Sequence, residues 1–173
     1  MEPDANSVVK IRYDAVMSQI HASPIRGGGE FAQLDEARLT SVESRIGFPL
    51  PADYREFVTK YGFTAGTGDV RFRDAESEIE SSVGAFYGVD PEHRADLVGM
   101  KEGFGDRLPA WILPVASSPG GLFCLSLAGE DLGSIFWWSP HRGSPDPLDD
   151  MELVAPSFDA FINSLIVVPE SDS

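Results

Sequence analysis

The sequence contains one cysteine, three histidines and no long apolar run, and each shortage argues against a class of protein. A single cysteine, Cys124, cannot form an internal disulfide, which is typical of a reducing compartment. No apolar run reaches the length that a bilayer requires, and the first residues lack the basic and apolar regions of a secretory signal. We therefore expect a cytoplasmic protein that does not contact membranes.

Basic residues are also scarce. The chain has 13 Lys and Arg against 28 Asp and Glu, which gives a formal net charge of -15. Such a surface repels nucleic acid and anionic lipid, and it attracts basic proteins and speeds their encounter. The acidity could equally serve solubility alone, and composition leaves both interpretations open.

Groups for catalysis or metal binding are few. Cys124 lies between Phe123 and Leu125 in an apolar run, where burial would make the thiol inert. The chain has three histidines, His21, His93 and His141. They lie far apart in the sequence and do not have the spacing of metal ligands. His141 lies near Asp146, Asp149 and Asp150 in a polar loop, and a hydrolase that uses these residues is the weakest alternative. We expect no enzyme activity, cofactor or metal.

Several helices are indicated by apolar residues at a 3.6-residue period. Residues 5–22 form the first predicted helix. The second begins near Asp35 and ends at Gly47, which tolerates the left-handed conformation that follows a helix. Pro51 suits the start of a third helix, which Gly62 ends.

Strands are predicted in the second half of the chain. Aromatic and β-branched runs over 111–116, 122–127 and 133–138 are separated by glycine-rich turns, as in an antiparallel meander. A strand near Val70, a short helix within 91–100 and a polar loop over 139–150 are also expected. Ser157 can cap a last helix, which we expect over 157–166. This order indicates an α+β fold with a mainly antiparallel sheet of four to six strands packed against helices.

The residues between Val42 and Gly62 resemble the opening signature of the SUKH superfamily, the Smi/Knr-like fold. That signature combines a Glu near a helix end, a Gly, a Leu-Pro, an acidic-aromatic pair and a final aromatic-Gly. Later segments at 112–116, 120–125, 133–137 and 154–161 are similar to family strands and to its closing helix. The matching residues of the signature are Glu43, Gly47, Leu50, Pro51, Asp53, Tyr54, Phe57, Tyr61 and Gly62.

The resemblance covers about residues 31–168 and implies a single SUKH-like domain over 1–173. The predicted helix at 5–22 lies outside the match, and 169–173 form a polar tail. The resemblance implies an interaction protein, because many bacterial members look like immunity proteins that neutralise toxins, often nucleases. We expect binding to a basic toxin domain, with the chain itself a monomer or weak homodimer. A regulatory scaffold for a cellular protein is the alternative.

Candidate partner-binding residues follow from charge and from aromatic side chains. Adjacent Trp137 and Trp138 must point to opposite faces of a strand, so one can be exposed as a binding anchor, although both could also be buried. Two acidic stretches could face a basic partner, or could simply be solvated. The acidic candidates are Asp74, Glu76, Glu78, Glu80, Asp149 and Asp150.

Overall fold

The computed structural model describes residues 36–61, 64–65, 70–73, 80–89 and 96–167. The predicted helix at 5–22, the polar tail and the acidic residues Asp74, Glu76 and Glu78 therefore lie outside the described residues. The helices are α2 (Glu36–Ile46), α3 (Ala52–Tyr61), α4 (Leu97–Phe104) and α5 (Phe158–Ser164), with 3₁₀ turns η1 (Gly105–Arg107) and η2 (Pro147–Asp150). The strands are β1 (Thr64–Ala65), β2 (Val70–Arg73), β3 (Glu80–Ser82), β4 (Ala85–Phe86), β5 (Ile112–Ser118), β6 (Gly121–Ser126), β7 (Ile135–Trp138), β8 (Met151–Ala155) and β9 (Leu165–Val167).

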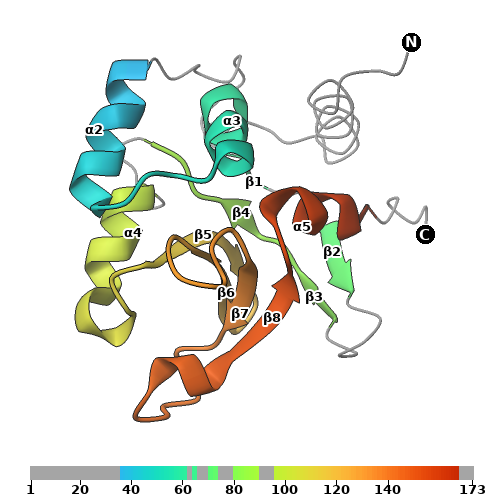
Figure 1. Ribbon diagram of the computed structural model, residues 1–173. Coiled ribbons are helices and arrows are strands. Elements are labelled where there is room, and N and C mark those ends of the chain that lie inside the picture. Colours follow the sequence, from blue (N-terminus) through green and yellow to red (C-terminus); the bar gives the residue numbers. More distant parts are fainter. Residues whose placement is uncertain (1–35, 62–63, 66–69, 74–79, 90–95, 168–173) are drawn as a thin grey trace.

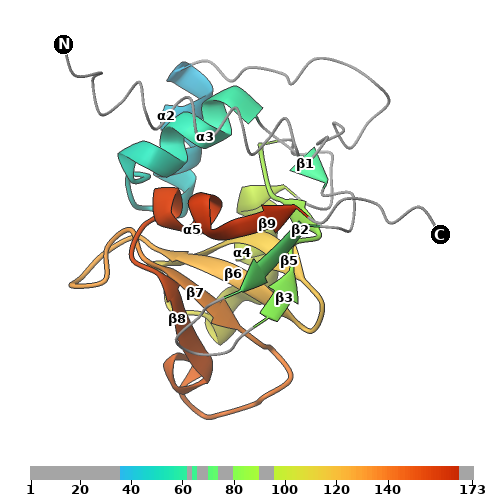
Figure 2. The ribbon, with the colours of Figure 1, turned by 90° about the vertical axis from the view of Figure 1, so that its right-hand side faces the viewer.

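The strands form two antiparallel sheets. The larger has six strands in the order β1-β4-β5-β6-β7-β8, and the smaller has three in the order β3-β2-β9. The expected antiparallel meander is β5-β6-β7, and the α+β prediction is confirmed. Figure 2 shows α4 on the far side of the larger sheet from β2 and β3.

Two helix signals of the sequence are realised as predicted. Gly47 follows α2 with a φ of 93°, and its N–H donates to the carbonyl of Glu43. Ser157 caps α5, since its hydroxyl accepts from the Ala160 N–H at 3.0 Å. Local chemistry alone therefore sets these two helix ends.

Other boundaries differ from expectation. The helix predicted within 91–100 begins at Leu97, because the Asp96 carboxylate accepts from the Gly99 N–H and so caps α4 there. The last helix ends at Ser164, before the predicted end. Leu165 instead starts β9 and pairs with Phe72 of β2. The turn η2 lies inside the loop predicted over 139–150, and strand β8, which follows that loop, was not predicted.

One face of the larger sheet is covered by α3 and α5 through an aromatic cluster. The Phe57 ring lies 4.8 Å from Phe158 and 5.2 Å from Phe86. Phe161 of α5 lies 4.8 Å from Phe123 of β6. All five rings are buried, so this cluster is the centre of the core.

The opposite face is covered only in part, by α4. Phe104 of that helix stacks edge-on against Trp138 at 5.5 Å. Figure 1 shows α4 beside α2, and Arg45 of α2 pairs with Glu102 of α4 at 3.3 Å. Farther along the same face, no residue of α4 lines the hollow around Phe136 of β7 and Met151 of β8.

Candidate protein-binding surface

Trp137 and Trp138 do point to opposite faces of β7. Trp138 is 3% exposed and packs under α4, with the Arg107 guanidinium 5.6 Å from its ring. Trp137 is half-buried: its indole N–H donates to the Ser118 hydroxyl at 2.9 Å, and Arg142 lies 5.3 Å from its ring. Trp138 is therefore a core residue, and only Trp137 reaches solvent.

Trp137 lies against Gly121 on the neighbouring strand. A Cβ at Gly121 would come within 2.5 Å of the Trp137 ring, so only glycine fits beneath the indole. Ser118 and Gly121 pair at the β5–β6 turn. The predicted turn between β5 and β6 thus also positions Trp137, through its hydrogen bond to Ser118 and the space left by Gly121.

Asp149 and Asp150 also separate. Asp149 is exposed on η2, where it remains a candidate for contact with a partner. Asp150 is only 6% exposed, and its carboxylate accepts from the Ser144 N–H at 2.9 Å and from the Ser144 hydroxyl at 2.5 Å. Asp150 thus closes the 144–150 loop, and its burial removes it from the candidate surface.

The other acidic candidates are not brought into one site. Asp74, Glu76 and Glu78 lie outside the described residues, and Glu80 starts β3 in the smaller sheet. A role for these four residues in binding stays a prediction.

The chemistry of the described residues gives a catalytic site little support. Burial raises the pKa of the Cys124 thiol well above its usual range, so almost no thiolate forms at neutral pH. His141 is exposed, and the carboxylate of Asp150 is held by Ser144. In the parts of the chain that the structure describes, no group of three or more His, Cys, Asp or Glu could hold a metal ion.

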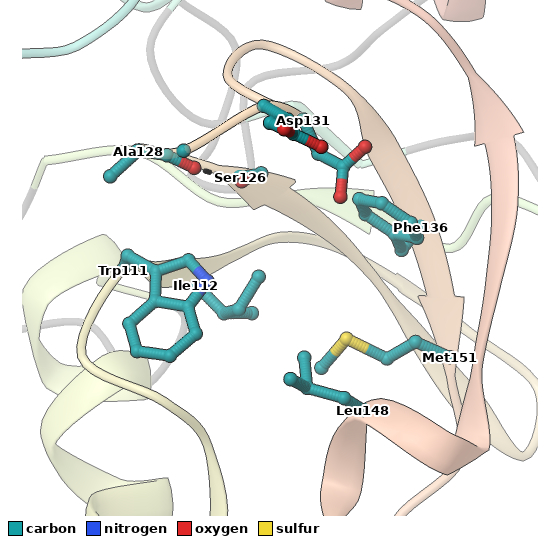
Figure 3. A pocket seen from close by; sticks show the side chains of 10 residues that line it. Trp111, Ile112, Ser126, Ala128, Asp131, Phe136, Leu148 and Met151 are labelled. Carbon is teal, nitrogen blue, oxygen red and sulfur yellow. Dashed lines mark hydrogen bonds between the residues drawn. The ribbon is translucent and has the colours of Figure 1, made fainter.

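A hollow of about 530 Å³ opens on the larger sheet at β7. Its walls come from the start of β5, the end of β6, the 128–131 turn, β7, and η2 with the start of β8. Figure 3 shows Trp111 on one side and Leu148 with Met151 on the other, and Asp131 lies at one end. The lining residues are Trp111, Ile112, Ser126, Ala128, Gly129, Glu130, Asp131, Phe136, Leu148 and Met151.

Strand register explains why these apolar side chains share a face. Cys124, Phe136 and Leu153 are direct cross-strand neighbours on β6, β7 and β8. Met151 lies two residues before Leu153 and so points to the same side. Cys124 is buried at the centre of the sheet, whereas Leu153 on the end strand is 55% exposed.

Of the large exposed hydrophobic side chains in the described residues, two line this hollow and two adjoin residues that line it. Trp111 and Leu148 line it and are 39% and 42% exposed. Leu132, 57% exposed, follows Asp131 in the turn above it, and Leu153 is the cross-strand neighbour of lining Phe136. Exposed apolar side chains are normal when scattered, but their concentration on one face marks a binding surface.

The charge of this surface has one sign. Glu130 and Asp131 line the hollow and are exposed, and Asp149 adjoins Leu148. No Lys or Arg is among the lining residues. Beside the hollow, the ammonium of Lys101 donates to the carbonyls of Ala110 and of lining Ile112, and burial lowers the pKa of this amine. The hollow is thus apolar inside and acidic at its rim.

Sequence reasoning missed this surface. Trp111, Phe136 and Met151 are typical of buried strands, and nothing in their spacing shows that the covering helix stops short of them. Leu132 and Leu148 did carry a signal, because each is a large aliphatic residue within a polar turn or loop. A large apolar residue in a polar loop either packs against a distant part of the chain or is exposed to bind a partner.

The fold and the surface define an α+β domain with helices on both faces of an antiparallel sheet. A model of the SMI1/KNR4 family (SUKH-1) matches residues 33–164. The chain belongs to this family, as its resemblance to the SUKH signature indicated.

A curated relative is an uncharacterised protein of Bacillus subtilis (strain 168), YokK, described as derived from the SPbeta prophage. It is 30% identical to this chain over 149 residues, which are 76% of this chain and 74% of the relative. In the part of the chain that the structure describes, no helix is both long and apolar enough to cross a membrane.

Proposed function

We propose that this protein is an immunity protein that neutralises a toxin by binding it in a stoichiometric complex. The observation that carries the proposal is the hollow at β7 of the described structure, which exposed Trp111 and Leu148 line and next to which Leu132 and Leu153 are also exposed. Exposed apolar surface of this kind is typical of sites that bind another protein, because the complex removes it from water.

Family membership supports the same function. Bacterial proteins with the SUKH signature resemble immunity proteins, and one relative of this chain is prophage-derived. The net charge of -15 suits a basic target such as a nuclease, whose phosphate-binding cleft must carry Lys and Arg. Neutralisation would then occur by bulk and charge, without a cofactor.

Coexpression tests the proposal. Proteins encoded beside this chain are screened for one that arrests the growth of a host cell, and that protein is expressed with and without the chain while growth is recorded. We expect the chain to restore growth and the two purified proteins to elute together in a fixed ratio. Growth arrest that the chain does not relieve, with separate elution, would count against immunity and favour a scaffold for a cellular protein.

A hydrolase is the alternative of another class. If the loop acids acted with His141, the purified protein would have a hydrolytic activity that His141→Ala abolishes. We expect His141→Ala to protect as well as the unchanged protein.

A further inference from the structure

We propose that the hollow between Trp111 and Leu148 docks a segment of a basic partner protein, which inserts an apolar side chain and places a Lys or Arg against Glu130 and Asp131. The inference rests on the proposed function and adds to it the contact surface and the chemistry of the partner. The proposed docking surface consists of the hollow and of two exposed leucines at its border, Leu132 and Leu153.

The apolar part of the site is suited to a side chain from another protein. Trp111 on one wall and Leu148 with Met151 on the other leave a space between large apolar side chains. Phe136 forms the floor from β7 and is itself only half-buried. Filling this space removes several apolar surfaces from water at once, which is how interface anchors contribute most of their affinity.

The exposed leucines at the border of the hollow favour a protein segment as the ligand, and not a small molecule. A molecule confined to the hollow would leave Leu132 and Leu153 in water, at 57% and 55% exposure. A polypeptide that crosses the hollow can cover both. The exposed apolar surface is thus wider than the hollow, as expected for a protein interface.

The acidic rim of the hollow favours a basic partner protein, and not a second copy of this chain. Glu130 and Asp131 are exposed carboxylates, and no lining residue neutralises them. A twofold dimer through this face would bring two such rims together between two chains of net charge -15 each, which costs free energy. A Lys or Arg of a partner instead gains charge-assisted hydrogen bonds there.

A library of random short peptides displayed on phage provides the probe. The full chain is immobilised, bound peptides are selected, and the enriched peptides are synthesised for affinity measurement. We expect them to share one large apolar side chain beside Lys or Arg. Trp111→Ala and Leu148→Ala should each weaken the selected peptides at least about tenfold.

Charge is tested separately with a matched pair of variants. Glu130→Lys reverses a rim charge, and Glu102→Lys makes the same change on α4, away from the hollow. We expect Glu130→Lys to weaken binding and to flatten its dependence on salt. Glu102→Lys should leave the affinity within about twofold, because a long-range field effect is screened at physiological salt.

Three results would overturn the docking site: selected peptides without basic residues, affinities that Trp111→Ala and Leu148→Ala leave unchanged, or a dimer of the chain that Trp111→Ala dissociates. Thermal melting confirms that each variant is folded. If Trp111→Ala is not folded, the result for Leu148→Ala decides, since Leu148 is exposed on η2.

The coexpression assay distinguishes failure of the docking site from failure of the proposed function. Protection that survives both apolar substitutions would refute the docking site alone, whereas peptide binding without protection would refute immunity alone.

Discussion

Neighbouring residues of this protein often have different tasks, as Asp149 and Asp150 show. Both are acidic and consecutive, yet Asp149 faces solvent and Asp150 satisfies the polar groups of Ser144 inside a loop. Trp137 and Trp138 differ in the same way because consecutive residues of a strand face opposite sides. Charge or size alone does not assign a residue to a surface.

Leu50 supplies a prediction at this scale. It lies between Pro49 and Pro51 and is 5% exposed, so Leu50→Ala removes buried methyl groups and leaves a cavity. We expect the free energy of unfolding to fall by about 2–5 kcal/mol. Urea unfolding measures the change, and Leu132→Ala serves as the exposed control, with an expected effect within about 0.5 kcal/mol. Equal effects of the two substitutions would show that Leu50 does not contribute to the core.

At the scale of elements, α2 and α3 are joined through Glu43. Its carboxylate accepts from the Leu50 N–H at 2.7 Å and from Arg55 Nε at 3.3 Å, and Arg55 also binds Glu36 at the start of α2. One side chain of α2 thus holds the turn before α3 and the first turn of α3 itself. The Glu of the SUKH signature therefore has a structural role here.

Substitution of Glu43 tests that role. Glu43→Ala leaves the partly buried Leu50 N–H without its acceptor, so we expect a loss of about 1–3 kcal/mol in the free energy of unfolding. Glu102→Ala removes the exposed pair with Arg45, whose side chains are 52% and 62% accessible, and should cost only about 0–1 kcal/mol. Glu43→Gln, which keeps an acceptor for Leu50, should fall between them. A loss for Glu43→Ala no larger than for Glu102→Ala would refute the role.

Which elements could be predicted depended on the range of the interactions that form them. Gly47, Ser157 and the apolar periods of α2 and α3 act within a few residues, and the helices they predicted are present. Strand β9 was missed because Leu165 fits either the end of a helix or a strand. Only its pairing with β2, far away in the sequence, selects the strand.

At the scale of the whole molecule, the net charge of -15 predicts how a partner arrives. Long-range attraction acts on encounter, so raising the salt concentration should slow association with a basic toxin far more than it speeds dissociation. Reversing Asp74, Glu76, Glu78 and Glu80 together should also slow association. Trp137→Ala, if Trp137 contacts the partner, should instead speed dissociation.

A binding sensor at two ionic strengths measures these rates for the toxin captured in the coexpression assay. The Glu102→Lys variant controls for a small change of net charge without a change at the candidate surfaces. An association rate that is indifferent both to salt and to the four reversals would leave solubility as the role of the acidity.

The sequence by itself determined the α+β class, the end of α2 at Gly47, the start of α5 at Ser157, the central β5-β6-β7 meander, the SUKH family and the burial of Cys124. These features depend on local periodicity, on turn residues and on ordered motifs, all of which can be read along the chain. Tertiary structure alone decided that α4 covers Trp138 and stops short of Phe136, and that Trp111, Leu132, Leu148 and Leu153 line or adjoin one hollow. Exposure of an apolar side chain depends on what packs over it, and that neighbour comes from a distant part of the chain.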